Sequence, residues 1–301
     1  MPTIAEVYAS LKIPPATGSL RRERPPSDSL VAVVEDIYCN PPVQARIAQA
    51  LEHLVEHNGF RLLNVEGNFH ELPLRRLRHL TAERLAEMME QGQVTGPERV
   101  GILSEEAVSV IGVDDCRLYR RNHQVMKVVM DNQKTLAPLL EALDRCGPSP
   151  MASLFGMDRG REDLSAEERR TAATLARLLR VQADNRDVDY AKQHLAAFAA
   201  PAIAKIVGPR TAGLEILEST LFAALEFYAL ARARQAAFVT GTLANMRRHN
   251  TDRSALVVGN FHTAGVLSLL ARKEIGCLLI SPSARGAADS DLYFDRMREQ
   301  A

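Results

Sequence analysis

The sequence carries no net charge, because its 37 Lys and Arg residues equal its 37 Asp and Glu residues. A chain without an excess of positive charge has no long-range field with which to hold a polyanion. We therefore expect no binding to nucleic acid or to an anionic membrane surface. The sequence also lacks an apolar stretch of 18 residues, which argues against a membrane-spanning helix.

Two further absences concern the cysteines and the N-terminus. The four cysteines are scattered, with no C-x-x-C pair and no zinc-ribbon spacing. The N-terminus has neither the basic start nor the uninterrupted apolar run of a signal peptide. Together these features predict a reduced, cytoplasmic protein.

Three motifs of common enzyme classes are absent as well. The sequence has no G-x-S-x-G elbow, no P-loop and no G-x-G-x-x-G following a predicted strand. These absences argue against assigning the chain to the serine hydrolases, the NTPases or the dinucleotide-dependent oxidoreductases.

Short continuous apolar runs, rich in Val, Ile and Leu, predict strands that are buried on both faces, as in a parallel sheet. These runs lie at 30–34, 61–65, 108–113, 255–259 and 276–280. Helical patterns connect them. We predict an α/β fold with a mostly parallel central sheet, flanking helices and a large helical insertion.

The predicted division of the chain has three parts. Residues 1–29 form a Pro-rich leader or arm, because its prolines cannot continue the short helix expected at its start. Residues 30–282 form a single α/β domain with the helical insertion at about 117–206. Residues 283–301 form a polar C-terminal tail.

Polar residues stand at or near the predicted carboxyl ends of the strands, where open α/β sheets bind their ligands. The candidates are Glu35, Asp36, Tyr38, Glu66, His70, Asp114, Asn260 and His262. A carboxylate and an imidazole that converge on one crevice could transfer protons or bind a metal. Each residue alone could instead be polar because the chain reaches the surface there.

His262 also stands at the start of a predicted helix. The positive end of the helix dipole favours the neutral imidazole, which is the form that acts as a base or a ligand. The alternative is that His262 only caps this helix or bonds a neighbouring carbonyl.

A rival motif is His53-Leu-Val-Glu56-His57, which matches the H-x-x-E-H pattern of inverted zinc peptidases. The motif falls in the last turn of its predicted helix, where histidines complement the negative helix end. We therefore expect a solvated helix face at this position.

The predicted helix at 211–248 carries an apolar stripe of Leu214, Leu217, Leu221, Leu225 and Tyr228. Such a stripe usually belongs to the core, so we expect it to cover the sheet, and the alternative is a contact surface of a homo-oligomer. Arg232 and Arg234, further along this helix, could contact an anionic group in the crevice or form surface ion pairs.

The order of these pieces resembles the superfamily that includes erythromycin esterases, the Tiki/TraB proteins and the ChaN-like haem-uptake proteins. The resemblance covers roughly 30–115 and 225–282, and it implies an α/β core with conserved polar residues at strand ends. Its second-strand and late-strand motifs stand here as Glu66-Gly67 and Gly259-Asn-Phe-His262. Gly112-Val-Asp114 matches a G-x-D element of the family. Arg234 resembles the arginine that the family carries on a helix.

The first-strand motif departs from the family pattern. Where the family has a histidine, this chain has Tyr38, and tyrosine is a poor ligand for zinc-like metals. We assign no metal ligand and leave the cofactor unknown, with a divalent metal as an open alternative.

Two functions remain. The first is a hydrolase-like pocket, esterase-like or peptidase-like, in which Glu66 and His262 activate water or bind a small-molecule or peptide ligand. Arg234 would hold an anionic or polarised oxygen, and Tyr38 and Asp114 would orient the substrate. The second is a catalytically silent protein of the same fold that binds a ligand or partner.

Overall fold

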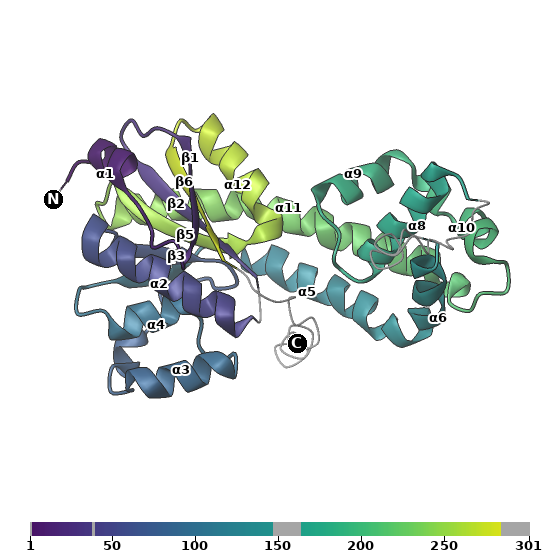
Figure 1. Ribbon diagram of the computed structural model, residues 1–301, viewed down its shortest axis with the longest axis horizontal. Helices are drawn as coiled ribbons and strands as arrows, with labels where there is room; N and C mark the ends of the chain where they lie inside the picture. The colour runs from purple at the N-terminus through teal and green to yellow at the C-terminus, as the bar shows by residue number, and fades with distance from the viewer. Residues whose placement is uncertain (1, 38–39, 147–163, 284–301) are drawn as a thin grey trace. The chain divides into compact units, whose positions relative to one another are not determined.

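The computed structural model describes residues 2–37, 40–146 and 164–283 of the chain (Figure 1). It confirms the predicted α/β fold with a mostly parallel sheet. Within those residues, six strands form one sheet in the order β1-β6-β2-β5-β3-β4. The strands are β1 (Gly18–Arg24), β2 (Leu30–Asp36), β3 (Leu62–Val65), β4 (Ser109–Gly112), β5 (Arg253–Gly259) and β6 (Gly276–Pro282).

The two central strands, β2 and β5, run parallel along their full length. Leu30 pairs with Arg253 at one end, and Asp36 pairs with Gly259 at the other. Strands β6, β3 and β4 are parallel to them, whereas β1 is antiparallel to β6. Because parallel neighbours end at the same edge, the residues that follow β2, β3, β4 and β5 emerge on one side of the sheet.

The edge strand β1 was not predicted from the sequence. It lies inside the segment that we expected to be a leader, and its flanking prolines stand outside the hydrogen-bonded residues. Its sequence, GSLRRER, is largely exposed, so no apolar alternation marks it as a strand. Arg22 of this strand donates to the carbonyl oxygens of Tyr8, Ala9 and Leu11, which ties α1 (Ile4–Ser10) to the sheet.

Helices cover both faces of the sheet, as Figure 1 shows for α12 (Asn260–Arg272) on one side and α2 (Pro41–Asn58) on the other. One core packs α2, α3 (Ala82–Glu90) and α4 (Gly96–Leu103) against alternate strand residues such as Val34 and Val257. The other packs Phe238 and Val266 against the intervening residues, such as Val33 and Val258. Burial on both faces explains why the central strands are apolar at nearly every position.

Several helix boundaries follow the signals in the sequence. Asn40 caps α2 by accepting from Val43, and Gly59 ends it in the left-handed conformation, with φ 72°. The expected cap at Thr81 accepts from the amide of Arg84, and Ser165 forms the expected capping box with Glu168. Helix α4, which begins with Gly96-Pro97, was not predicted.

The chain divides into two compact units, Met1–Tyr119 with Arg232–Gln300, and Arg120–Ala231. The boundaries fall inside α5 (Cys116–Asp131) and α11 (Leu217–Arg248). The second unit overlaps the predicted insertion at 117–206 and extends beyond it. It also contains α6 (Gln133–Asp144), α8 (Ala166–Leu179), α9 (Asn185–Gln193) and α10 (Ala200–Val207).

The apolar stripe on α11 belongs to the core of the helical unit. Leu217, Leu221, Leu225 and Tyr228 are all buried, as expected for a core stripe. They lie in the unit that contains none of the described strands, so the stripe does not cover the sheet as predicted. It therefore gives no support to a homo-oligomer formed through the 211–248 helix. The proposed tail, 283–301, lies outside the described residues except for Ser283, whose amide donates to the Thr17 carbonyl.

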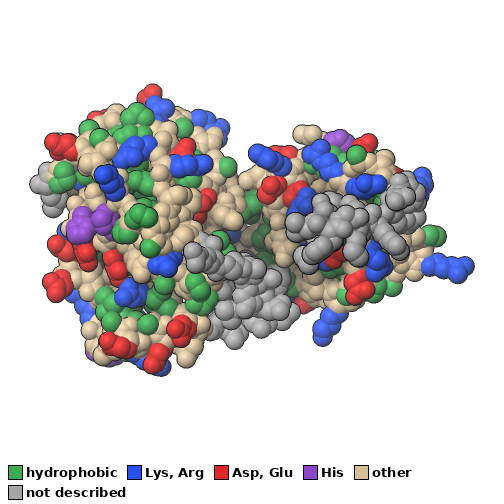
Figure 2. All heavy atoms as spheres, in the orientation of Figure 1, with side chains coloured by type: hydrophobic (Ala, Val, Ile, Leu, Met, Phe, Trp, Pro, Cys, Tyr) green, Lys and Arg blue, Asp and Glu red, His purple; other side chains and the backbone are tan. Residues whose placement is uncertain are grey.

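On the face of the sheet-bearing unit that Figure 2 shows, acidic and basic side chains are interspersed. This distribution agrees with the balanced charge of the sequence. No helix in the described part of the chain has both the length and the hydrophobicity that a bilayer crossing requires.

Candidate functional site

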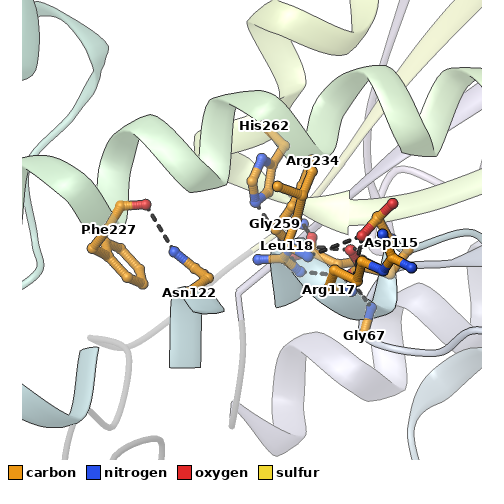
Figure 3. A network of polar contacts seen from close by, with 11 residues as sticks. Gly67, Asp115, Arg117, Leu118, Asn122, Phe227, Arg234, Gly259 and His262 are labelled. Carbon is orange, nitrogen blue, oxygen red and sulfur yellow. Dashed lines mark hydrogen bonds and ion pairs between the residues drawn. The ribbon is translucent and has the colours of Figure 1, made fainter. Parts of the chain in front are cut away.

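Four of the predicted site residues meet at the carboxyl edge of the sheet. Glu66 directly follows β3, Asp114 lies two residues beyond β4, and His262 lies in the first turn of α12, just after β5. Arg234 reaches them from α11. Figure 3 shows the His262 ring directed from α12 toward the cluster around Arg234 and Gly259.

Glu66 links the histidine to the arginine. Its Oε1 atom accepts from Arg234 Nη2 at 2.8 Å and lies 3.2 Å from His262 Nε2. Its Oε2 atom accepts from the backbone amide of Gly259 at 3.0 Å. The side chains of Glu66, Arg234 and His262 are only 6–7% exposed, so these contacts form away from bulk water.

Asp114 holds the other side of the arginine. Arg234 Nε donates to Oδ1 at 3.0 Å and Nη2 to Oδ2 at 2.5 Å, a bidentate pair. The amide of Gly67 also donates to Oδ2, at 3.1 Å. The Asp114 side chain is 0% exposed, so it anchors Arg234 and cannot touch a substrate in this conformation.

The loop after Glu66 is fixed against the end of β4. Gly112 donates to the His70 carbonyl at 2.9 Å, and the Asp114 amide donates to the Asn68 carbonyl at 3.0 Å. A Cβ atom on Gly112 would lie 2.0 Å from the Asn68 carbonyl carbon. Only glycine fits there, which gives a physical reason for the Gly112-Val-Asp114 element.

Asp115, the neighbour of Asp114, has a structural role. Its Oδ1 atom accepts from the amides of Arg117 and Leu118 at 2.8 and 2.9 Å, and so caps α5 (Figure 3). Two adjacent aspartates thus serve different purposes, which the sequence alone did not separate.

Aromatic rings surround the cluster. Phe238 and Phe261 meet the His262 ring edge to face at centroid distances of 5.1 and 5.4 Å. The Arg234 guanidinium lies 5.1 Å from the centroid of Tyr119. Burial raises the pKa of the Tyr119 hydroxyl, against the opposing charge of Arg234. Sequence reasoning missed these rings, although Phe238 stands one helical turn after Arg234.

The Nδ1 atom of His262 is buried, and no hydrogen-bond partner for it is found among the described residues. The other ring nitrogen faces a carboxylate. In the neutral imidazole one nitrogen donates and the other accepts. A ring that donates from Nε2 to Glu66 therefore presents a lone pair on Nδ1.

No protein-family model and no curated protein matches the chain. A solved structure of a protein from Bacillus cereus is similar to it, with a TM-score of 0.27 and 16% sequence identity. The similarity covers 85% of this chain and 65% of that protein, so the chain spans less than two thirds of that protein's length. These comparisons assign no family to the chain.

The remaining predicted site residues lie elsewhere. His70 and Asn260 are exposed, and neither side chain is part of the cluster. Glu35 is half-buried at the end of β2. Tyr38 lies outside the described residues.

Asp36 points to the opposite face of the sheet from Glu66. Its Oδ1 atom accepts from Gln44 of α2 at 2.7 Å, and the other end of that amide accepts from the Gly96 backbone at 2.8 Å. Burial raises the pKa of the Asp36 carboxyl from 3.8 to about 7, and the Glu66 charge adds to the rise, against the Gln44 hydrogen bond.

The raised pKa predicts a pH-dependent contribution of Asp36 to stability. Folding favours its protonated form, so the contribution is largest below 3.8, falls as the pH rises toward 7 and is lost above that value. Relative to Asp36→Asn, the wild-type unfolding free energy should fall by at least about 1 kcal/mol, the value of one pKa unit, between about pH 4 and pH 8. Urea unfolding at several pH values measures this difference.

Asp28→Asn, at an exposed position, is the control for this measurement. A difference between wild type and Asp36→Asn that stays constant with pH would show that burial does not perturb the carboxyl.

Among the residues that the structure describes, no group of three or more His, Cys, Asp or Glu side chains is arranged to hold a metal ion. At the rival H-x-x-E-H motif, the side chains of His57 and Glu56 are 60% and 64% exposed. This is the solvated helix face that the sequence predicts.

Proposed function

We propose that the cluster at the carboxyl edge of the sheet is a hydrolytic site in which His262 is the base and Glu66 orients it. The 3.2 Å contact between His262 Nε2 and Glu66 Oε1 carries this proposal. A carboxylate that accepts from one ring nitrogen fixes the orientation and tautomer of the imidazole. The lone pair on Nδ1 then takes a proton from a water molecule.

Glu66 itself is a positioning residue in this proposal. Its carboxylate already accepts from Arg234 and the Gly259 amide and faces His262, which uses most of its acceptor capacity. Arg234 likewise has Nε and Nη2 committed to carboxylates. The roles that we expected from the sequence therefore shift, because Arg234 and Asp114 hold Glu66 and do not contact the substrate.

The proposed substrate class is an ester or amide of a small molecule or peptide. Glu35 supplies a further carboxylate on the same face of the sheet. It pairs with Val258, and Val65 pairs with Val257, so Glu35 and Glu66 project on either side of Val258. Two strand spacings place their backbones roughly 10 Å apart.

A screen of p-nitrophenyl esters and short peptides tests this proposal, with wild type, Glu66→Gln and His262→Asn measured side by side. We expect turnover by wild type that both substitutions reduce. Turnover that neither substitution changes, or a folded wild type that turns over none of the compounds, would refute it.

The second candidate is a catalytically silent protein that binds a ligand or partner. Two observations favour it: the carboxylates of the cluster are saturated by internal partners, and Phe222 of the helical unit is 64% exposed. An exposed aromatic side chain of this size is typical of contact surfaces. A strictly monomeric protein that hydrolyses an ester or peptide would count against this candidate.

A further inference from the structure

Two polar groups at the start of α12, Nδ1 of His262 and Oγ1 of Thr263, are buried without hydrogen-bond partners among the described residues. The two residues are 4% and 6% exposed. Gln235 on α11, whose side chain packs against α12, is 7% exposed. Buried polar groups are usually paired, so two unpaired groups on adjacent residues need an explanation.

Gly265 shows where the Gln235 amide lies. A Cβ atom on Gly265 would meet the amide oxygen, carbon and nitrogen of Gln235 at 1.9, 2.4 and 2.9 Å. Gly265 is three residues beyond His262, so the two positions are neighbours on one face of α12. Phe238, one turn beyond Gln235 on α11, touches the His262 ring. The Gln235 amide therefore packs on the side of α12 that carries His262.

An unpaired buried polar group such as the Thr263 hydroxyl lowers stability, and an apolar side chain of similar shape would avoid that cost. Sites that bind polar ligands accept this cost, because their polar groups are paired only when the ligand is present. The amide group of Gln235 offers two N–H donors, and the hydroxyl of Thr263 offers one. Neutral donors of this kind suit an uncharged carbonyl oxygen.

We propose that Gln235 is a substrate-binding residue that donates from Nε2 to the carbonyl oxygen of a neutral ester or amide, with Thr263 as a second donor. This inference rests on the proposed hydrolytic function. The water oxygen bonds to the carbonyl carbon, and His262 Nδ1 takes the water proton. The carbonyl electron pair moves onto the oxygen held by Gln235 and Thr263. Collapse of this intermediate breaks the bond to the leaving group, which receives the proton from His262.

The first test is independent of turnover. Thr263→Val removes the buried, unpaired hydroxyl but keeps the approximate shape of the side chain, so the melting temperature should rise by about 2–4 °C. If the Thr263 hydroxyl instead makes a hydrogen bond that supports the fold, the same substitution would lower the melting temperature, and the inference would fall.

The second test is kinetic, with p-nitrophenyl acetate as the probe. Loss of one donor to a developing oxyanion lowers kcat by about 10²–10³-fold, and we expect this loss in Gln235→Met with KM little changed. Gly265→Ala should lower kcat too, because its new Cβ displaces the amide, but it should have no further effect in a Gln235→Ala background. Equal kcat for wild type and Gln235→Met would overturn the inference.

A non-reactive probe separates this inference from the proposed function. N-methylacetamide should shift the NMR signals of the Gln235 side-chain amide in a saturable way, with exposed Gln193 as the reference for non-specific effects. A saturable shift without any turnover would support carbonyl binding and refute the hydrolytic function. Turnover that depends on His262, without a shift at Gln235, would support the hydrolytic function and refute this inference.

Discussion

Replacement of Arg234 by Met is expected to lower the unfolding free energy by about 3–5 kcal/mol, the usual cost of removing one partner from a buried ion pair. The side chain bridges Glu66 and Asp114, whose own side chains are 7% and 0% exposed. Without the guanidinium, two carboxylates would remain buried together without a positive partner. Urea unfolding followed by circular dichroism measures the loss.

Arg84→Met is the matched control, because the Arg84–Glu87 pair on α3 is more than half exposed at both side chains. Exposed pairs of this kind contribute about 0–1 kcal/mol. Adding Glu66→Gln and Asp114→Asn to the Arg234 variant should recover part of the lost stability, because both buried charges are then removed. A loss at Arg234 no larger than the loss at Arg84 would show that the cluster does not hold the sheet edge together.

The second large effect is expected at His262. Asn at this position removes the imidazole that takes the proton, so kcat on any ester found in the screen should fall by about 10²–10⁴-fold. Asn still offers an amide donor toward Glu66, so the cluster should keep its structure. The far-ultraviolet circular dichroism spectrum checks that the fold is retained.

His249→Asn, at an exposed position near the end of α11, controls for general effects of losing a histidine. It should leave kcat unchanged. A His262 variant that is folded and retains wild-type kcat would remove the base from the proposed mechanism.

The fold could be predicted where burial leaves a clear pattern. Strands such as Leu30–Asp36 are apolar along most of their length because helices cover both faces. Strand β1 was not predicted because an exposed edge strand has no core-facing pattern, and its one large apolar residue, Leu20, is followed by four charged residues.

The site could be predicted only in part. Glu66, Asp114 and His262 each follow a strand, and parallel strands bring such positions to one edge. The direction of Asp36 could not be predicted, because neighbouring residues of a strand face opposite sides and the relevant side depends on packing against α2. Gln235 and Phe238 were not predicted as site residues. A side chain on a helix joins a site only when that helix packs beside it, and the sequence does not show this packing.

The tautomer of His262 tests the central claim most directly, that Glu66 holds the ring through Nε2 and leaves Nδ1 as the base. Two-bond ¹H–¹⁵N correlation spectra of histidine-labelled protein identify which ring nitrogen carries the proton when the imidazole is neutral. The expected result is the Nε2–H tautomer in wild type, with the preference weakened in Glu66→Gln. A neutral ring with its proton on Nδ1 would contradict the proposed arrangement.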